Sequence, residues 1–288
     1  MRQRNILGVR VDLDLTMEDV VSIIENRLLK DGKSHYLCTT NPEFIMKAQK
    51  DSDFRDIINN SDLSLPDGVG VLMADEYLGK TEKFSRDLLF PVRCLFTGLG
   101  VGLTYLVKGG KGKKRVSGVD LVYRLCGLSG EKKYSVFFLG GEKDEEKGES
   151  SVNASDKIIE KYPYANIVGA SSGFFYSKED DARSIDFLHS CMSRHSVTDL
   201  DLLFVAYGQG NQEKWIVRNS SKLPVRVSVG VGSTFNLIAG HNMNIRNKFK
   251  SWNLEWLARL LVEPKRIVRI FTAFPLFPTK VFFDSLKH

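Results

Sequence analysis

Apolar runs of five to eight residues alternate along the chain with segments in which apolar residues recur every three or four positions. The runs predict strands at residues 6–11, 34–39, 62–66, 134–141, 165–170, 201–208 and 225–232. The other segments predict helices at residues 16–30, 42–59, 152–162, 178–194 and 211–222. Strands that alternate with helices predict an α/β fold, Rossmann-like, with a parallel sheet covered by helices on both faces.

Residues 88–107 do not fit this alternation, because they are almost entirely apolar over nearly the length of a membrane span. Arg93, Pro91 and three glycines argue against a free spanning helix. We expect this insertion to form a re-entrant or surface-lying hairpin, with Lys108, Lys111, Lys113 and Lys114 at lipid headgroups. A long apolar loop packed on the domain is the alternative.

The C-terminal segment also departs from the alternation, and it carries the charge. Residues 241–288 contain nine Lys and Arg but only three Asp and Glu, so this segment holds the whole formal net charge of +6. We divide the chain into an α/β core at residues 1–245 and a basic, helical appendage at residues 246–288. Its helices are expected to end at Val262 and to resume at Pro264.

Aromatic residues lie between these bases, at positions 252, 256, 271, 274, 277, 282 and 283. This mixture is typical of a face that binds an anionic membrane surface. Aromatics with arginine could also stack nucleobases, but no nucleic-acid motif accompanies them, so nucleic acid is not an expected partner.

The composition is that of a folded globular protein, with 42% hydrophobic and 26% charged residues. The four cysteines are far apart and have neither CxxC nor metal-ligand spacing, which indicates free thiols in a reducing compartment. The first residues contain no apolar run typical of a secretory signal. We therefore expect an intracellular protein without a metal or another cofactor.

Two turns that follow predicted strands carry side chains with candidate chemistry. Thr39, Thr40 and Asn41 open a helix, where a polar ligand or phosphate can bind, although a helix cap alone would explain them. Asp67 stands at a strand tip, where a carboxylate can act as a general base, although Asp-Gly is also an ordinary turn. Ligands of parallel sheets bind at this edge.

Two further turns are rich in glycine. The turn at residues 208–213 opens a helix but lacks GxGxxG spacing, which disfavours a dinucleotide fold and hence an oxidoreductase. The turn at residues 230–234 exposes backbone that can approach a diphosphate. Each turn is a weak signal alone, but four at one sheet edge predict a nucleotide-diphosphate site.

Seven short motifs occur in an order that is found in one enzyme family. They are TxNPEF at residues 39–44, LPDGVG at 65–70, RVSGVD at 115–120, FFLGG at 137–141, GxGNQEKW at 208–215, GVGSTFNLIAG at 230–240 and LEWLARLLVEPKRIVR at 254–269. From about Asn5 to Arg269 the chain therefore resembles the WecG/TagA/CpsF glycosyltransferases, glycosyltransferase family 26.

The resemblance implies an inverting, metal-independent hexosyltransferase of cell-surface polysaccharide synthesis. It implies transfer of an N-acetylmannosamine-type sugar from a UDP donor to polyprenyl-diphosphate-linked N-acetylglucosamine. It also implies a peripheral position on the inner face of the cell membrane. Homo-oligomers are possible. The alternative is a non-catalytic protein of the same fold that binds a UDP-sugar or a lipid diphosphate.

The resemblance implies that Asp67 is the catalytic base and that Thr39 is its neighbour in the active site. The turns and the resemblance together suggest substrate-binding residues, which are Asn41, Arg115, Gly140, Gln212, Glu213, Gly230, Gly232, Asn236, Arg259, Arg266 and Arg269. Without a DxD-like metal motif, guanidinium groups would balance the diphosphate charge. Solvation or lipid binding is the alternative role of the three C-terminal arginines.

The chain departs from the family pattern at several positions. The family usually has Pro where Gly210 stands, Asp where Asn236 stands, and Ala-Pro where Asn247 and Lys248 follow Arg246. The missing carboxylate at position 236 bears on the donor sugar more than on the type of reaction. The apolar insertion at residues 88–107 is longer than the family pattern predicts.

Overall fold

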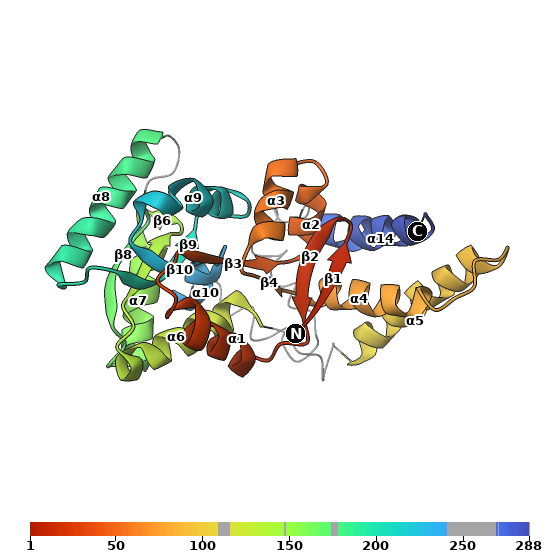
Figure 1. The fold of residues 1–288 in the computed structure, drawn as a ribbon, viewed down its shortest axis with the longest axis horizontal. Coiled ribbons are helices and arrows are strands. Elements are labelled where there is room, and N and C mark those ends of the chain that lie inside the picture. Colours follow the sequence, from red (N-terminus) through yellow and green to blue (C-terminus); the bar gives the residue numbers. More distant parts are fainter. Residues whose placement is uncertain (109–115, 147, 174–177, 241–268, 270, 288) are drawn as a thin grey trace.

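A six-stranded parallel sheet forms the centre of the protein in a computed structural model that describes residues 1–108, 116–146, 148–173, 178–240, 269 and 271–287 (Figure 1). The strand order is β4-β3-β10-β9-β5-β8. The strands are β3 (His35–Thr40), β4 (Leu63–Pro66), β5 (Val136–Gly140), β8 (Ile167–Ser171), β9 (Leu200–Ala206) and β10 (Val225–Gly230). The predicted α/β class is confirmed, and these six strands lie where the sequence predicts them.

Helices cover both faces of the sheet. Side chains alternate between the two faces along each strand, and because apolar side chains point to both, both faces need a cover. On one face Phe138 and Phe204 share a core with helices α1 (Met17–Ile23), α6 (Gly118–Lys132), α7 (Ser150–Lys161) and α10 (Thr234–Ile238). On the other face Phe137 and Val205 pack with α8 (Lys178–Arg194) and α9 (Asn211–Asn219). Figure 1 shows these two groups of helices on opposite sides of the sheet.

The predicted strand at residues 6–11 is wrong, because the chain turns within it. Strands β1 (Arg2–Ile6) and β2 (Val9–Leu13) form an antiparallel hairpin outside the main sheet. At the turn, Leu7 and Gly8 have φ angles of 52° and 81°. A leucine rarely adopts such a conformation, so Gly8 was the one sign of a turn there.

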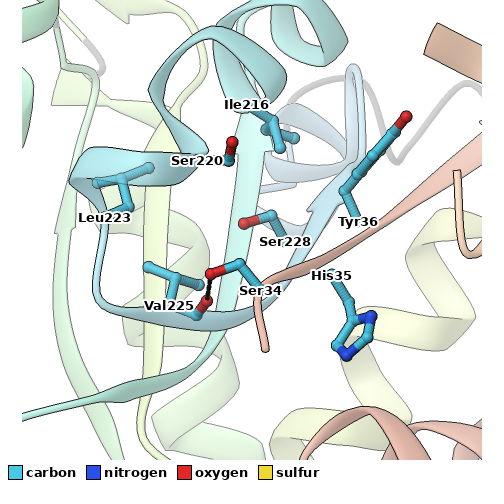
Figure 2. A pocket seen from close by; sticks show the side chains of 8 residues that line it. All are labelled: Ser34, His35, Tyr36, Ile216, Ser220, Leu223, Val225 and Ser228. Carbon is cyan, nitrogen blue, oxygen red and sulfur yellow. Dashed lines mark hydrogen bonds between the residues drawn. The ribbon is translucent and has the colours of Figure 1, made fainter. Parts of the chain in front are cut away.

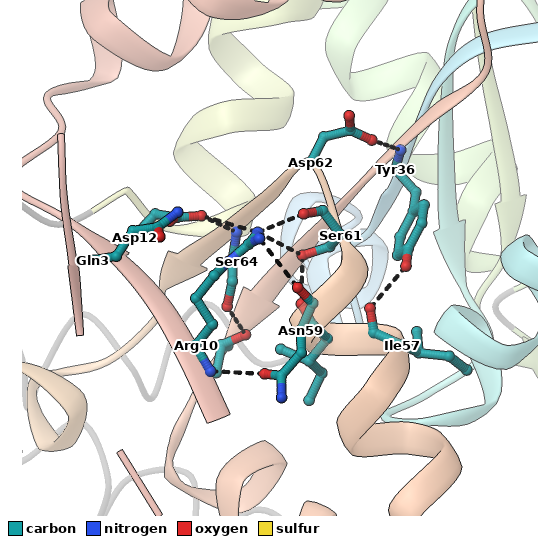
Figure 3. Close-up of polar contacts among 11 residues, drawn as sticks. Gln3, Arg10, Asp12, Tyr36, Ile57, Asn59, Ser61, Asp62 and Ser64 are labelled. Atoms are coloured by element: carbon teal, nitrogen blue, oxygen red, sulfur yellow. Dashed lines mark hydrogen bonds and ion pairs between the residues drawn. The ribbon is translucent and has the colours of Figure 1, made fainter. Parts of the chain in front are cut away.

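The hairpin is joined to the sheet through a buried carboxylate. Asp12 on β2 accepts a hydrogen bond from the backbone N–H of Ser64 on β4, at 2.8 Å, and others from Gln3 and Arg10 (Figure 3). A buried carboxylate is stable only when its oxygens are paired in this way. The hairpin therefore fixes the strand whose end carries Asp67.

The predicted helix at residues 42–59 is divided into α2 (Pro42–Ala48) and α3 (Ser52–Asn60). Asp51 starts the second helix, since its side chain accepts a hydrogen bond from the N–H of Phe54 at 3.0 Å. A capping box of Thr16 and Asp19 begins α1. Beyond α1 the chain continues in a π-helical turn, η1 (Ile24–Leu28), and beyond α9 in a 3₁₀ turn, η2 (Ser220–Lys222). Two short strands, β6 (Lys143–Asp144) and β7 (Gly148–Glu149), pair between β5 and α7.

The apolar insertion is one continuous helix, α5 (Phe90–Lys108), so the expected hairpin is wrong. Pro91 lies in its first turn, where the missing N–H costs no helical hydrogen bond. One side of α5 packs on α4 (Val69–Thr81), and Gly98 lies there against the Tyr77 ring. This packing offsets the poor helix propensity of glycine.

The last helix, α14 (Phe277–Ser285), packs into the same core cluster as α2, α4 and α5. It follows a π-helical turn, η4 (Thr272–Leu276). The structure buries Phe277, which the sequence placed with the membrane-facing aromatics, whereas Phe271, Phe274 and Phe283 are exposed. The expected helices between residues 246 and 268 lie outside the described residues, and the division at residue 245 stays a prediction.

Candidate active site

The four predicted turns lie along the carboxyl edge of the sheet, where β4, β3, β10 and β9 end side by side. The hydroxyl of Thr39 donates to the carbonyl oxygen of Gly230 at 3.0 Å, which joins the ends of β3 and β10. The backbone N–H of Asp67 donates to the carbonyl oxygen of Thr40 at 2.8 Å. Thr39 is buried and Asp67 is half-buried, so the proposed base and its neighbour lie on adjacent strand ends.

Two buried side chains at the start of α9 hold the turns after β9 and β10 together. Gln212 accepts a hydrogen bond from the N–H of Gly232 at 2.9 Å and donates to Glu213 at 2.6 Å. Glu213 in turn accepts from the N–H of Gly210 at 2.8 Å. These contacts give both side chains a positioning role, and their contact with a substrate stays a prediction.

Glu213 is fully buried, and this burial raises its pKa to about 7 in spite of the hydrogen bonds that it accepts. Its carboxyl group therefore changes charge near neutral pH. Glu213 accepts the hydrogen bond from the backbone N–H of Gly210, so the protonation of Glu213 affects the turn after β9.

Glycines leave open backbone at three of these strand ends. Gly68, Gly208 and Gly232 have φ angles of 99°, 82° and 56°, and a Cβ at each would meet no atom within 4 Å. A ligand can thus approach the main chain closely here. Gly140 is different, because a Cβ there would lie 2.8 Å from the carbonyl carbon of Ala206. It is needed for the packing of β5 against β9.

Asn41 caps α2, since its side-chain oxygen accepts from the N–H of Phe44 at 3.0 Å. The simpler reading of this residue, a helix cap, is therefore present, and a ligand contact through its amide nitrogen stays a prediction. Asn236 lies half-buried on α10, and among the described residues its side-chain oxygen has no hydrogen-bond partner.

The N-terminus of α6 lies beside Thr39. A Cβ at Gly118 would be 3.8 Å from the methyl group of Thr39 and 3.3 Å from the hydroxyl of Thr234. Helix N-termini carry partial positive charge and bind anions. Arg115 comes shortly before this helix in the sequence but lies outside the described residues, as do Arg259 and Arg266.

Arg269 is described, and it ties the C-terminal segment to the same region. Its guanidinium donates to the carboxylate of Glu43 at 2.6 Å. Glu43 lies in the first turn of α2, two residues after Asn41. The C-terminal segment therefore returns to the helix that begins at the end of β3.

Sequence reasoning missed two serines beyond the end of β5. Ser150 and Ser151 at the start of α7 are fully buried, and their hydroxyls have no hydrogen-bond partner among the described residues. A Cβ at Gly141 would lie 2.3 Å from the hydroxyl oxygen of Ser150. The sequence signal that could have found them is a pair of serines between the FFLGG motif and the predicted helix at residues 152–162.

A shallow hollow lies at the opposite, amino edge of the sheet (Figure 2). Its lining includes Ser34, which donates to the carbonyl oxygen of Val225 at 2.9 Å. His35 also lines it, between Asp31 and Asp62; burial alone would lower the pKa of His35, but hydrogen bonds to both carboxylates raise it. These groups are paired within the protein and lie away from the four turns.

The sequence profile of the glycosyl transferase WecG/TagA/CpsF family matches residues 4–87 and 93–288. The chain belongs to the WecG/TagA/CpsF glycosyltransferase family. The resemblance seen in the motifs is thereby confirmed. The match leaves out residues 88–92, at the start of α5, and it resumes at residue 93, so most of the apolar segment at residues 88–107 lies within the family profile.

Members of this glycosyltransferase family from three bacteria are similar to the chain over most of its length. Each is an N-acetylglucosaminyldiphosphoundecaprenol N-acetyl-beta-D-mannosaminyltransferase. The one from Bacillus spizizenii strain W23 is 27% identical over 96% of this chain and 88% of the relative. The Bacillus subtilis strain 168 protein is 27% identical over 87% and 80%, and that of Staphylococcus aureus strain MRSA252 is 25% identical over 96% and 91%.

One departure from the WecG/TagA/CpsF pattern has a structural reason. Gly210 has a φ of 83°, which proline cannot adopt, and a Cβ there would lie 2.2 Å from the ammonium nitrogen of Lys47. Lys47 on α2 donates to the carbonyl oxygen of Gln209 at 2.9 Å. In this chain, therefore, a lysine occupies the space beside the turn.

Among the described residues, no three His, Cys, Asp or Glu side chains are grouped as metal ligands. Independence from metal stays a prediction.

Proposed function

We propose that this glycosyltransferase moves an N-acetylmannosamine-type sugar from UDP to N-acetylglucosamine on a polyprenyl diphosphate, with inversion and without metal. Support comes from the relatives, whose names state this sugar and this acceptor and which match the chain along most of its length. The observation that carries the proposal is the position of Asp67 at the end of β4, beside the end of β3 that carries Thr39, among backbone turns left open by glycine.

In the proposed reaction Asp67 takes the proton of the acceptor hydroxyl. The acceptor oxygen then forms a bond to the anomeric carbon of the donor sugar, and the bond from that carbon to the diphosphate oxygen breaks. A single displacement of this kind inverts the anomeric configuration, and UDP leaves with the electron pair. The hairpin contact through Asp12 and the hydrogen bond to Thr40 hold the Asp67 backbone for this step.

Backbone and hydroxyl groups are well placed to receive the donor. The N-terminus of α6 suits the diphosphate, because the first N–H groups of a helix have no acceptor within the helix. The hydroxyls of Ser150 and Ser151 and the side-chain oxygen of Asn236 suit polar atoms of the nucleotide or sugar. Arg115, Arg259, Arg266 and Arg269 are expected to supply positive charge.

We place the enzyme at the inner face of the cell membrane as a peripheral protein. Its proposed acceptor is anchored in lipid by its polyprenyl chain. The C-terminal 48 residues carry the whole net charge of the protein, which favours an anionic surface.

One observation favours the alternative of a non-catalytic binding protein. Asn236 replaces the aspartate of the family pattern, so the site lacks one carboxylate. This alternative predicts that the protein binds UDP-sugars but releases no UDP when an acceptor is added.

A screen of UDP-sugars for UDP release tests the proposal, with a short-chain polyprenyl-diphosphate N-acetylglucosamine as acceptor. We expect release with UDP-N-acetylmannosamine that requires the acceptor and continues in EDTA. Binding of UDP-sugars without release from any of them would overturn the transferase proposal. Loss of release in EDTA with recovery in magnesium would overturn only its metal-independent part.

A further inference from the structure

Helix α5 is apolar on the side that packs against the protein and also on the side that does not. Phe90, Cys94, Val101 and Tyr105 lie on one side and are buried. The opposite side carries Val92, Leu95, Phe96, Leu99, Leu103, Leu106 and Val107, which are 47–77% exposed. These positions recur every three or four residues, so they form one continuous stripe along the helix.

Charged groups are placed at the ends of this stripe. Between Phe90 and Val107, α5 has a single charged residue, Arg93, near its start. The guanidinium of Arg93 donates to the carboxylate of Asp87 at 2.6 Å and to the carbonyl oxygen of Ser85 at 2.7 Å. The sequence from residue 108 to 115 then holds five bases and no acid. An apolar stripe with basic flanks matches the layering of an anionic bilayer, in which lipid tails meet apolar groups and headgroups meet bases.

We propose that α5 lies in the surface of an anionic lipid bilayer, with this stripe in contact with the acyl chains. A helix that is apolar on all sides is normally buried in protein or lipid. Of residues 90–107, however, only 22% are buried in the protein. The inference deepens the proposed function, on which it rests for its biological meaning, because a polyprenyl-linked acceptor is reached from a membrane.

The packing of α5 defines how it would lie. Its contacts with the protein run from Phe90 to Tyr105, which is about 22 Å of helix. A helix held along this length by one side cannot cross the bilayer by itself, so it lies along the surface. The hairpin expected from the sequence is wrong, but its expected place at the surface is retained in the proposal.

Lipid fits the exposed stripe better than a second copy of the chain. Interfaces between proteins combine an apolar centre with a polar rim and hydrogen bonds, whereas the outward side of α5 from Leu95 to Val107 offers aliphatic, phenyl and glycine surface with one threonine, Thr104. Phe283 on α14, a helix that packs with α5, is also exposed, as are Phe271 and Phe274 just before α14. Figure 1 shows α5 and α14 together at the end of the molecule far from α8.

A fluorophore on the stripe tests the proposal directly. Leu103→Cys, which is 63% exposed, is labelled with an environment-sensitive dye in the full-length protein, whose cysteines are all buried. We expect a blue shift on addition of vesicles of phosphatidylglycerol and phosphatidylcholine. The matched control is Val152→Cys on α7, which is 38% exposed and should not shift. No shift at position 103, while the protein sediments with the vesicles, overturns the proposal.

A second variant separates lipid from a second copy. Leu99→Asp combined with Leu103→Asp is compared with Val152→Asp combined with Ile159→Asp, at exposed sites on α7. We expect at least tenfold weaker vesicle binding for the α5 pair alone, and equal sedimentation coefficients without lipid. Unchanged vesicle binding, or loss of a dimer only in the α5 pair, would contradict the proposal. The vesicles hold no acceptor, so the result does not depend on whether the protein is a transferase.

Discussion

At the end of β10, the side chains of Gln212 and Glu213 fill the space beside Gly230. A Cβ at this glycine would lie 2.4 Å from one carboxylate oxygen of Glu213 and 2.7 Å from the amide nitrogen of Gln212. Both side chains are buried and committed to hydrogen bonds, so neither can move aside cheaply. The shape of the carboxyl edge thus depends on the size of single residues.

Gly230→Ala should lower the free energy of unfolding by about 1–3 kcal/mol, because the added methyl group overpacks a fixed network. Gly232→Ala is the matched control, since its Cβ would enter open space and meets only the strain of a φ of 56°, about 1 kcal/mol. Urea unfolding of the three proteins measures the difference. Equal stability of Gly230→Ala and the wild type would contradict this prediction, because it would show that the side chains of Gln212 and Glu213 can move aside.

The raised pKa of Glu213 predicts a pH dependence of stability. A carboxyl group whose pKa is near 7 in the folded protein and about 4.5 when unfolded binds its proton more tightly in the fold. The contribution of this group to the free energy of unfolding is complete below pH 4.5. It is lost as the pH rises to about 7, and the loss amounts to as much as about 3 kcal/mol. Urea unfolding between pH 5 and 8 should show this fall in the wild type and a smaller one in Glu213→Gln. Parallel curves would contradict it.

Among the elements, strands were the most predictable. The six strands of the main sheet are short apolar runs with clear ends, whereas the turn at Leu7 and Gly8 uses a leucine conformation that no sequence pattern marks. The expected hairpin at residues 88–107 failed for a related reason. Glycines lower helix propensity, but contact with Tyr77 and the rest of α4 outweighs that cost.

The ion pair between Arg269 and Glu43 gives a prediction for the C-terminal segment. If it holds that segment at the start of α2, Arg269→Ala should lower turnover of a water-soluble acceptor at least tenfold with little change in vesicle binding. Glu43→Gln should act in the same direction. Lys280→Ala on α14 removes the same charge and should leave turnover unchanged. Turnover near the wild-type value in Arg269→Ala would remove this arginine from the site.

At the scale of the whole molecule, the sequence located the edge of the sheet that carries the site but not the contacts within it. Parallel topology places all strand ends together, so Thr39, Asp67 and the two glycine turns could be grouped in advance. The network of Gln212 and Glu213 joins residues from separate turns, and no local pattern encodes such a contact. For the same reason the buried hydroxyls of Ser150 and Ser151 were not expected.

The packing of α14 also changes the view of the C-terminal segment. Phe277 and Val281 are buried in a cluster that includes α2 and α4, and Tyr77 hydrogen-bonds Ser285 at 2.8 Å. The end of the chain therefore contributes to the stability of the part that begins with the N-terminal hairpin. Phe271, Phe274 and Phe283 of this segment stay exposed.

The central claim is that Asp67 acts as the base at the carboxyl edge. The most direct measurement is the rate of sugar transfer from UDP-N-acetylmannosamine to the short-chain lipid acceptor by Asp67→Asn, together with UDP binding by calorimetry. Asp56→Asn on the exposed side of α3 is the matched control. The account predicts a loss of about 10²–10⁴-fold in rate with UDP affinity within threefold of the wild type. A rate within threefold of the wild type in Asp67→Asn would contradict it.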